Sequence, residues 1–477
     1  MALSCGYYRA MTRLNTLTLP SLPPAVQTPT YRRDALAPAI VHLGVGGFHR
    51  AHEAVYCDDL LGQGLGDWGI VGVGLRPEDR AMRDALVPQD GLYTLVTRDA
   101  DGDTARVVGS LTRYLFAPEQ DAEVRSALAA RATKIVSLTI TEGGYEDPTG
   151  PAWTHLAAAL ETRRAQGTPP FTVLSCDNLQ SNGEAARRAL VAAASSRSAD
   201  LAAWVEANVA FPNAMVDRIT PQTTGSDREM VRTEFGIDDA WPVVCEPFKQ
   251  WIVEDTFPQG RPQWEAVGAQ FVADVHPYES MKLGLLNGSH FAMAYLGFLA
   301  GFETVPAVMA DPDFRQFISR LMDAEVTPLL PPVPGIDLTA YKATLLHRFD
   351  NPAIKDQITR LCLDGAPKFP KYLRPALEQA VETGRPRRLL TLALAGWLRY
   401  LIGEDESGRA YSISDPRIGE LQPLARAGRT DPRPLLAVTD IFGSLGQSPE
   451  MVRDLSADLE SLYERGARAT LAAVLKK

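Results

Sequence analysis

The stretch AIVHLGVGGFH, residues Ala39–His49, decides the fold of the first half of the chain. Its first five residues have the composition of a buried β-strand, and the glycines after them open a helical pattern. Gly44 permits a tight turn, and Gly46 lets the backbone approach a pyrophosphate at the helix N-terminus. His49 stands where the usual motif has its third glycine. The loop alone is therefore a degenerate dinucleotide motif, and an ordinary strand-to-helix turn is the alternative.

Further strand and helix patterns alternate after this loop. Short apolar runs typical of buried strands occupy residues 68–75, 135–140 and 171–176, and helix-compatible stretches at 51–61 and 122–132 lie between strands. Strand, helix and strand in series predict a parallel sheet with right-handed crossovers. Together with the glycine loop, this order predicts a Rossmann-type domain.

The second half of the chain has a different pattern. After Pro277 there are few convincing strands, and long helical patterns occupy residues 280–299, 312–324, 387–402 and 449–475. The Pro-rich segment 326–338 predicts an ordered loop or linker. The 477 residues exceed one ordinary core. We therefore expect an α/β plus all-α protein, with a Rossmann-type NAD-binding domain over residues 1–280, of which 1–17 are a loose extension, and a mostly helical substrate-binding and catalytic domain over 281–477.

Composition excludes several classes of protein. The net charge of −10 argues against nonspecific binding to nucleic acid, which depends on many cationic contacts. No apolar run reaches the length of about 18 residues that a membrane span needs, and the first 17 residues lack the apolar core of a signal peptide. The five cysteines are scattered without a C-x-x-C pair, which favours reduced thiols. We expect a cytoplasmic protein that binds neither nucleic acid nor a membrane.

A charged segment at the end of the second predicted strand bears on the choice of cofactor. The sequence RPED, residues 76–79, places Glu78 and Asp79 where the adenosine ribose should lie. A carboxylate there accepts a hydrogen bond from a 2′-hydroxyl and repels a 2′-phosphate, which favours NAD over NADP. Arg76 weakens this argument because an arginine can accommodate the phosphate, and a charged helix start is the structural alternative.

The stretch PYESMKLGLLNGSH, residues Pro277–His290, contains the catalytic candidates. In an α-helix each residue turns by about 100°, so His290 lies at about 80° and Asn287 at about 140° from Lys282. Glu279 lies at about 60° from Lys282 if the helix has begun there. Polar groups in an apolar setting cost several kcal/mol unless they are satisfied or used. Four convergent polar side chains therefore favour a functional over a structural role.

These residue types suit the oxidation of an alcohol. A lysine whose pKa is lowered by burial can accept the hydroxyl proton while hydride leaves. A positioned base typically contributes about 10²–10⁴-fold. Amide donors should face the oxygen that becomes a carbonyl, and Asn287 supplies one. Asn178, which follows the fourth predicted strand in the sequence SCDN, supplies a second.

Two other enzyme classes fit less well. Tyr278 and Lys282 form the Y-x-x-x-K pair of short-chain dehydrogenases, but there the pair lies inside the Rossmann domain after a different glycine loop. Catalytic zinc needs three converging ligands, and no local cluster of ligands is present in the sequence. His49 and His52 lie three residues apart, where a role near the cofactor or in capping is expected. We therefore expect no catalytic metal.

At these residues the chain resembles the long-chain mannitol dehydrogenase family of polyol dehydrogenases. The sequence VDRITP, residues 216–221, looks like the family signature, and GVGGFHRAH, residues 44–52, is similar to the family's cofactor loop. Lys282, Asn287 and His290 match the family's K-x-x-x-x-N-x-x-H active site. The resemblance covers nearly the whole chain.

The resemblance implies a role for each site residue. Lys282 would be the general base, Asn178 and Asn287 would form the oxyanion hole, and His290 would orient the substrate. Glu279 would gate release of the proton. The polyol would be bound by Asp217, Arg360 and Lys368. We expect the cofactor to be bound by Gly44, Gly46, Gly47, Phe48, His49, Arg50, Glu78, Asp79, Thr141 and Glu142, with Asp79 on the ribose of NAD.

Structural alternatives stay open for the substrate residues. Arg360 and Lys368 could be ordinary solvated charges, and Asp217 with Arg218 could be an internal ion pair that braces the domain junction. Only the family positions raise these residues above those alternatives.

The expected function is the NAD-dependent, metal-independent oxidation of a polyol by a monomeric enzyme. D-Mannitol, oxidised to D-fructose, is the first candidate, and D-arabinitol and D-sorbitol are further ones. A reductase of keto-uronates such as fructuronate or tagaturonate is the alternative within the family, and it needs an extra cation for the carboxylate. A catalytically dead nucleotide-sensing protein is the alternative outside enzymes, and the intact active-site residues argue against it.

Overall fold

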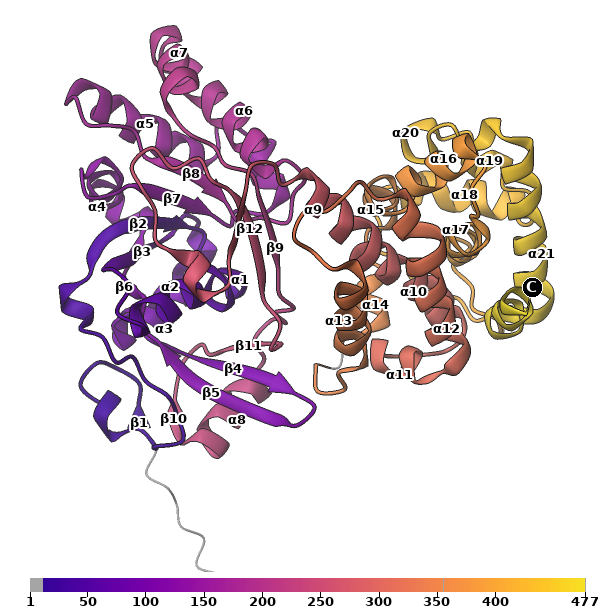
Figure 1. Ribbon diagram of the computed structural model, residues 1–477, viewed down its shortest axis with the longest axis horizontal. Coiled ribbons are helices and arrows are strands. Elements are labelled where there is room, and N and C mark those ends of the chain that lie inside the picture. The colour runs from indigo at the N-terminus through magenta and orange to yellow at the C-terminus, as the bar shows by residue number, and fades with distance from the viewer. Residues whose placement is uncertain (1–11, 355, 477) are drawn as a thin grey trace, which may run out of the picture. The chain divides into compact units, whose positions relative to one another are not determined.

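The computed structural model describes residues 12–354 and 356–476 and divides into two compact units, with the division along the chain between His276 and Pro277. Sequence patterns placed this division after residue 280. The N-terminal unit combines β-strands with helices, and the described part of the C-terminal unit consists of helices and loops (Figure 1). The predicted class, α/β followed by all-α, is confirmed.

A five-stranded parallel sheet forms the centre of the N-terminal unit. Its strand order is β6-β3-β2-β7-β8, so the chain starts in the middle with β2 and adds strands first on one side and then on the other. This is the order of a Rossmann fold. Four strands match predicted apolar runs, and β6 was not predicted. The strands are β2 (Ala37–Leu43), β3 (Trp68–Gly74), β6 (Leu111–Phe116), β7 (Ile135–Leu138) and β8 (Thr172–Ser175).

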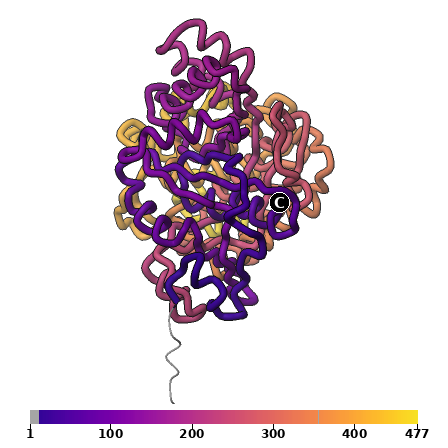
Figure 2. Tube along the Cα trace, turned by 90° about the vertical axis from the view of Figure 1, so that its left-hand side faces the viewer, coloured from indigo at the N-terminus to yellow at the C-terminus, as the bar shows by residue number. Residues whose placement is uncertain are grey.

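Helices cover both faces of this sheet because its strands are apolar on both sides. Val41 and Leu43 pack into a core with α4 to α7, whereas Ile40 packs on the opposite face with α1 and α2. Side chains alternate along a strand, so His42 also points toward α2. Figure 2 shows α5 to α7 grouped at one end of the unit. The helices are α1 (Gly47–Ala51), α2 (Glu53–Gly62), α3 (Arg80–Leu86), α4 (Ala117–Ala129), α5 (Pro151–Ala165), α6 (Asn182–Ser195), α7 (Ala199–Asn208) and α8 (Gly225–Phe235).

Beside the central sheet, the described residues of the N-terminal unit form three smaller sheets, in the orders β11-β4-β5, β13-β12-β9 and β1-β10. Their strands are β1 (Thr12–Arg13), β4 (Tyr93–Asp99), β5 (Gly102–Val108), β9 (Ala214–Asp217), β10 (Ile237–Asp238), β11 (Val243–Cys245), β12 (Gln250–Glu254) and β13 (Gln270–Val272). Strand β1 and the fully buried Leu14 belong to the segment expected to be a loose extension. Residues 12–14 are therefore ordered, and the first eleven residues of that segment lie outside the described residues.

The C-terminal unit contains the long helices that the sequence predicted, but π-helical turns interrupt two of them, the predicted helices 280–299 and 312–324. The predicted helix 280–299 is divided into α9, a π-helical turn at Lys282–Asn287, and α10. A second π-helical turn occupies Leu321–Val326. The helices are α9 (His276–Met281), α10 (Gly288–Leu299), α11 (Val305–Ala310), α12 (Pro312–Arg320), α13 (Leu338–Asp350), α14 (Ile358–Leu361), α15 (Gly365–Tyr372), α16 (Arg374–Thr383), α17 (Arg388–Tyr400), α18 (Ile418–Gly428), α19 (Arg433–Leu436), α20 (Thr439–Phe442) and α21 (Pro449–Leu475).

Close packing of α10 against α17 anchors the segment that carries the catalytic candidates. Gly396 lies on α17 at the crossing, where an added Cβ atom would come 2.8 Å from the side chain of Leu296. One residue further, Trp397 is surrounded by aromatic rings whose centroids lie 5.3–5.6 Å from its own, those of Phe291, Phe369 and Phe442. The residues that follow the π-helical turn are thus held in a densely packed core.

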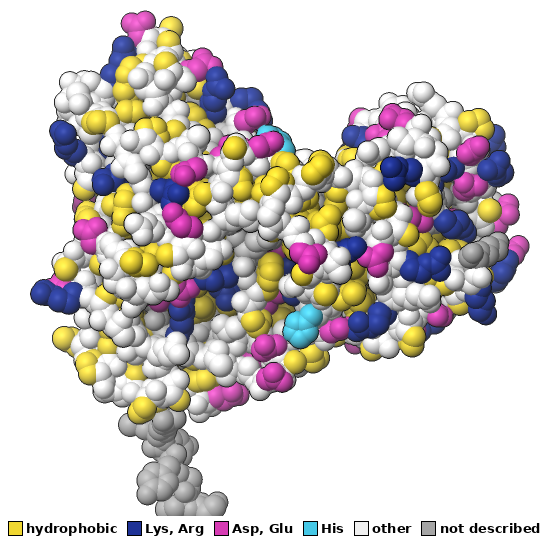
Figure 3. Space-filling model, viewed as in Figure 1, with side chains coloured by type: hydrophobic (Ala, Val, Ile, Leu, Met, Phe, Trp, Pro, Cys, Tyr) yellow, Lys and Arg dark blue, Asp and Glu magenta, His cyan; other side chains and the backbone are white. Residues whose placement is uncertain are grey.

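The helices, the surface charges and the cysteines of the described residues match what the composition predicts. Among the described helices, none has both the length and the apolar character needed to cross a membrane. On the face drawn in Figure 3, acidic and basic side chains are interspersed over the described residues. The four cysteines among those residues, Cys57, Cys176, Cys245 and Cys362, are buried and unpaired.

Candidate functional site

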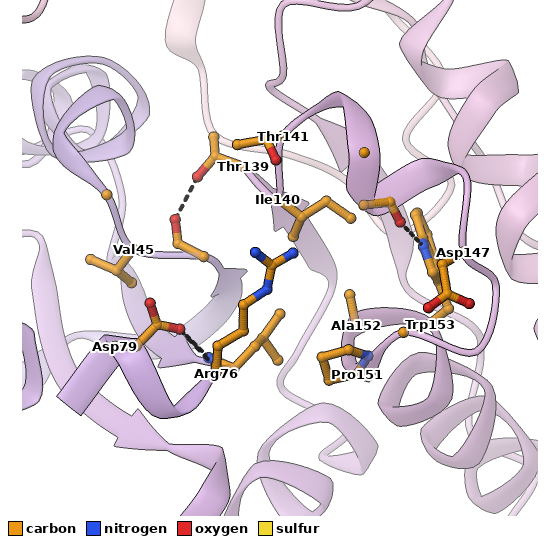
Figure 4. A pocket seen from close by; sticks show the side chains of 16 residues that line it. Val45, Arg76, Asp79, Thr139, Ile140, Thr141, Asp147, Pro151, Ala152 and Trp153 are labelled. Carbon is orange, nitrogen blue, oxygen red and sulfur yellow. Dashed lines mark hydrogen bonds between the residues drawn. The ribbon is translucent and has the colours of Figure 1, made fainter. Parts of the chain in front are cut away.

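A cavity lies at the carboxyl ends of β2, β3 and β7 in the N-terminal unit (Figure 4). Gly44 adopts a φ of +91°, and a Cβ atom there would lie 2.3 Å from the carbonyl oxygen of Thr139. Only glycine fits this close approach between the loop and β7. The cavity is lined by Gly44, Val45, Gly46, Leu75, Arg76, Asp79, Thr139, Ile140, Thr141, Gly143, Gly144, Asp147, Gly150, Pro151, Ala152 and Trp153.

Four of the residues expected to bind the cofactor line this cavity, namely Gly44, Gly46, Asp79 and Thr141. The other six, Gly47, Phe48, His49, Arg50, Glu78 and Glu142, are not among the described residues that line it. Other residues that line the cavity, such as Asp147 and Trp153, carry no signal in the sequence. Their positions depend on the turn between β7 and α5, which has no motif of its own.

Asp79 and Arg76 both face the cavity. The Asp79 carboxylate accepts hydrogen bonds from the backbone N–H groups of Leu75, at 2.7 Å, and Arg76, at 2.9 Å, which fixes it at the end of β3. The Arg76 guanidinium extends toward the middle of the cavity (Figure 4). One side chain that would repel a 2′-phosphate therefore stands beside one that would attract it.

Replacing Asp79 with asparagine should shift the preference between the two nicotinamide cofactors. The amide oxygen can still accept a backbone hydrogen bond, but the negative charge is gone and Arg76 stays. A hydrogen bond to a charged group contributes about 1.5–3 kcal/mol, so we expect the ratio of kcat/KM for NAD over NADP to fall about 10–100-fold. Steady-state kinetics with both cofactors measures this ratio. Asp84→Asn, which removes an exposed carboxylate from α3, is the control.

Phe48 and Arg50 support the glycine loop through packing. The Arg50 side chain is fully buried, and its guanidinium donates hydrogen bonds to the carbonyl oxygens of Gly46 and Trp241. Phe48 stacks on His52, with 4.9 Å between ring centroids. These contacts hold the loop and the start of α2, which is a role that the resemblance did not assign to either residue.

His49 belongs to a buried polar cluster on the face of the sheet that α1 and α2 cover. Its Nδ1 atom lies 3.2 Å from the Glu53 carboxylate, and the Nδ1 atom of His42 lies 3.1 Å from the same oxygen. The two imidazole rings stack with 3.4 Å between centroids. His42 also bonds to Thr139, whose hydroxyl donates to the carbonyl oxygen of Gly44. The cluster thus connects α2 to the glycine loop.

The spacing of this cluster also resembles that of a metal site, since its ligand atoms lie within 4.8 Å of one another. A metal ion binds an imidazole nitrogen in the plane of the ring. The rings of His42 and His49 are inclined by only 15° and lie face to face, so their planes share no nearby point. One ion could therefore not lie in the planes of both rings, and the cluster holds one Glu53 carboxylate oxygen close to two stacked imidazoles.

The stability of the protein should fall as the pH is lowered from 7 to 5. Burial lowers the pKa of His49 to about 4 and that of His52 to about 3. Between these values and about 6.5, the unfolded chain binds protons that the native state does not, so unfolding becomes easier as pH falls. Each histidine contributes a slope that approaches about 1.4 kcal/mol per pH unit.

Protonation of Glu53 also lowers the stability of the protein as the pH falls. Burial raises the pKa of the Glu53 carboxyl, but the close approach of His42 and His49 outweighs burial and holds that pKa below the usual range. Its contribution to stability is therefore present above about pH 4.5 and is lost below. Urea unfolding at pH 7, 6 and 5 measures the slope. It should be smaller in His49→Gln and unchanged in the exposed His347→Gln, whereas a wild-type free energy of unfolding that is constant or rises toward pH 5 would contradict this prediction.

Asn178 follows β8 in a loop that is fixed by a buried asparagine at the start of α6. The Asn182 side-chain amide donates to the carbonyl oxygens of Ser175, Asp177 and Ala214, and its own oxygen accepts from the N–H of Ala214. Asn182 is fully buried. Nothing in the sequence marks Asn182 as important, because its hydrogen-bond partners are backbone atoms at and after the end of β8 and at the start of β9.

The catalytic candidates of the C-terminal unit lie on one continuous helical segment. Lys282 is 6% exposed and Glu279 is 5% exposed. The backbone N–H of Gly288 donates to the carbonyl oxygen of Leu283, five residues earlier, which is the bond of a π-helix. The angles expected for a regular α-helix are therefore wrong for this segment.

The π-helical turn changes how the two principal candidates are related. In a π-helix residues five apart follow one another along the same face. Lys282 and Asn287 are five apart, so the turn brings both side chains to one side. The side-chain oxygen of Asn287 is buried without a hydrogen-bond partner among the described residues. Beyond the turn, the His290 ring packs against Phe349, with 4.9 Å between centroids.

The expected substrate residues come from both units. Asp217 ends β9 in the N-terminal unit and is buried. Its neighbour Arg218 donates hydrogen bonds to the carbonyl oxygens of Ala51, at 2.6 Å, and Glu246, at 3.0 Å. Arg218 therefore braces the backbone of the N-terminal unit itself.

In the C-terminal unit, Arg360 and Lys368 both have partners close to them in sequence. Arg360 forms an ion pair with Asp356 four residues earlier. The Lys368 ammonium donates hydrogen bonds to the carbonyl oxygens of Leu361 and Leu363, and burial lowers its pKa. The Lys368 side chain is thus only partly buried, next to residues 361–364, whereas Arg360 is largely exposed.

Sequence comparisons identify two family domains that together cover most of the chain. The sequence profile described as "Mannitol dehydrogenase Rossmann domain" matches residues 38–266. The profile described as "Mannitol dehydrogenase C-terminal domain" matches residues 274–463. These two ranges follow the division into structural units.

Curated relatives match over nearly their full length. The chain is 46% identical to a mannitol 2-dehydrogenase of Pyrenophora tritici-repentis, over 97% of this chain and 86% of the relative. It is 47% identical to a mannitol 2-dehydrogenase of Aspergillus fumigatus, over 94% of this chain and 95% of the relative.

Two solved structures are similar over almost the whole chain. A ternary complex of Pseudomonas fluorescens mannitol 2-dehydrogenase with NAD and D-mannitol has a TM-score of 0.87 and 47% identity, and the match covers 98% of this chain and 100% of that one. A D-sorbitol dehydrogenase in substrate-free form has a TM-score of 0.90 and 35% identity, over 96% of this chain and 100% of that one.

Proposed function

This chain belongs to the mannitol dehydrogenase family, and we propose that it catalyses the NAD-dependent interconversion of D-mannitol and D-fructose. One observation carries the proposal. A buried lysine, Lys282, stands five residues before Asn287 on a π-helical turn, in a chain whose other unit has a dinucleotide cavity. The similar Pseudomonas enzyme was solved with NAD and D-mannitol.

Lys282 is the general base of the proposed reaction. A lysine must be neutral to accept a proton, and burial favours the neutral form of an amine. The Lys282 amine takes the proton of the C2 hydroxyl as hydride leaves C2. NAD, when bound, supplies the hydride acceptor. Glu279, three residues before Lys282, receives the proton from the lysine and passes it toward solvent.

Asn178 and Asn287 act on the same oxygen atom. As the alcohol becomes a ketone, charge develops on this oxygen, and two amide N–H donors stabilise it. His290 orients the substrate from the next turn of the helix. Asp217, Lys368 and Arg360 bind the remaining hydroxyl groups of the polyol, and the partly buried Lys368 contributes more than the exposed Arg360.

A substrate panel tests the proposed function. D-Mannitol, D-arabinitol and D-sorbitol are assayed with NAD and NADP, and fructuronate and tagaturonate are assayed with NADH. We expect the highest kcat/KM for D-mannitol with NAD. Faster reduction of a keto-uronate would favour the alternative within the family, and tight NADH binding without turnover of any substrate would favour a nucleotide-sensing protein.

We propose further that the enzyme works as a monomer in the cytoplasm, without catalytic metal and without nucleic acid. The family resemblance and the net charge of −10 support this. Light scattering coupled to size-exclusion chromatography should give the mass of one chain. Dialysis against a chelator should leave mannitol oxidation unchanged, and metal-dependent recovery of activity would overturn the proposal.

A further inference from the structure

The loop after β7 forms one wall of the cofactor cavity and contains a backbone conformation that is unusual for its residue. Thr141 has φ 65° and ψ 162°, a region that glycine occupies almost alone. Thr139, Ile140 and Thr141 all line the cavity (Figure 4). Strain of this kind persists only where the surroundings hold it in place.

Asp177, 36 residues further along the chain, holds this loop. One oxygen of its carboxylate accepts a hydrogen bond from the N–H of Thr141 and the other from the N–H of Ile140, each at 2.9 Å. The Tyr145 hydroxyl donates a third hydrogen bond to Asp177, at 2.6 Å, and also bonds to Ser175. Asp177 is 9% exposed. Both carboxylate oxygens are thus committed to the loop.

Two further bonds close the loop on itself. The N–H of Gly144 donates to the carbonyl oxygen of Thr141 at 2.9 Å, and the indole N–H of Trp153 donates to the carbonyl oxygen of Gly144 at 2.6 Å. These bonds fix the residues after Thr141. Among the hydrogen bonds of the described residues, those to Asp177 alone fix the backbone N–H groups of Ile140 and Thr141.

We propose that Asp177 is a positioning residue that keeps the strained loop at Thr141 in the shape that binds the cofactor. This inference rests on the proposed function, since it assigns the cavity to NAD. Asp177 directly precedes Asn178, and its own carbonyl oxygen is fixed by Asn182. Asp177 therefore fixes the loop that forms one wall of the cofactor cavity, and it also lies next to Asn178, the proposed oxyanion-hole donor.

A carboxylate is needed here because two N–H donors point at one side chain. Asparagine offers one acceptor oxygen, and its amide N–H₂ would face the second backbone N–H. Asp177→Asn is nearly isosteric and removes one half of the clamp. Without it, Thr141 can relax toward an ordinary backbone conformation and carry the wall of the cavity with it.

Binding of NADH, followed by its fluorescence in the absence of polyol, tests the inference. Asp177→Asn should weaken binding by about 10-fold, the factor that corresponds to ~1.4 kcal/mol. The effect should shrink to less than about threefold in a Thr141→Gly background, because glycine adopts this conformation without strain. Equal factors in both backgrounds, or no weakening in either, would overturn the proposal.

A matched control separates positioning from general destabilisation. Asp239 is also a buried carboxylate of the N-terminal unit and accepts hydrogen bonds from the N–H groups of Thr94 and Trp241. Asp239→Asn should lower the melting temperature as Asp177→Asn does, but leave NADH binding within about twofold. If Asp177→Asn does not fold, Tyr145→Phe removes one donor to the same carboxylate and should weaken binding by a smaller factor, with the same suppression by Thr141→Gly.

Amide hydrogen exchange tests the positioning role of Asp177 independently of the proposed function. If the wild-type protein does not bind NADH, the proposed function fails. The clamp is then read from the amide protons of Ile140 and Thr141, which should exchange about 10-fold faster in Asp177→Asn than in the wild type, the factor expected when opening costs ~1.4 kcal/mol less. Unchanged exchange at both positions would overturn the positioning role even in a protein that binds no cofactor.

Discussion

Lys282→Ala is expected to lower kcat for mannitol oxidation by about 10²–10⁴-fold, which is the contribution of a positioned general base. The alanine side chain has no group that can take the hydroxyl proton, and the hydride cannot leave before that proton has somewhere to go. Binding of NADH should stay within about twofold of the wild-type value, because the cavity belongs to the other structural unit.

The experiment combines turnover with cofactor binding and chemical rescue. Small primary amines added to Lys282→Ala should restore part of the activity, more so at a pH where the free amine is neutral. Lys342→Ala is a matched control, since Lys342 lies on α13 of the same unit and bonds to Asp323. Undiminished mannitol oxidation by Lys282→Ala would exclude a lysine base.

Loss of an oxyanion-hole donor should have the second-largest effect. We expect Asn287→Ala and Asn178→Ala each to lower kcat by about 10²–10³-fold, the usual consequence of removing one such donor. KM should change little, because the donors act on charge that develops only in the transition state. The effect should appear in both directions of the reaction, since mannitol oxidation and fructose reduction share that transition state.

The two asparagines can be compared through a double variant. If both donors act on one oxygen, their effects should be non-additive in Asn178→Ala/Asn287→Ala. Asn208→Ala is the control, since the amide of Asn208 is exposed at the end of α7 and donates to the carbonyl oxygen of Trp204. A change confined to KM would mean that these residues bind the ground state and do not stabilise the transition state.

Much of the fold follows from apolar patterns in the sequence, and the exceptions are short or irregular elements. Strands β2, β3, β7 and β8 are largely apolar runs, because a parallel sheet is covered on both faces. The two residues of β1 are too few to show any period, so they were expected to be loose. The π-helical turn at Lys282–Asn287 also escapes prediction, because an i to i+5 bond leaves no compositional mark.

In the candidate site too, residues close together in the sequence could be predicted, whereas contacts between residues far apart in the sequence could not. Lys282, Asn287 and His290 could be found because they stand close together in an apolar helix. Asp177 could not be given a role, since its partners are backbone groups 36 and 37 residues earlier. The side chain of His49 is buried beside Glu53, and the contact with the cofactor expected from the family loop stays a prediction. Sequence identifies the loop but not the direction in which each of its side chains points.

The π-helical turn makes the length of this segment as important as its composition. The turn accommodates one residue more than a regular helix, and each residue of an α-helix adds a rotation of about 100°. If this segment wound as a regular α-helix at its present length, Lys282 and Asn287 would lie about 140° apart. With one residue fewer between them, regular winding would leave the two groups about 40° apart and again on one face. Related chains that keep the turn should therefore have four residues between the lysine and the asparagine, and related chains that lack the turn should have three. In the Pro-rich segment before α13, a change of length has no such consequence.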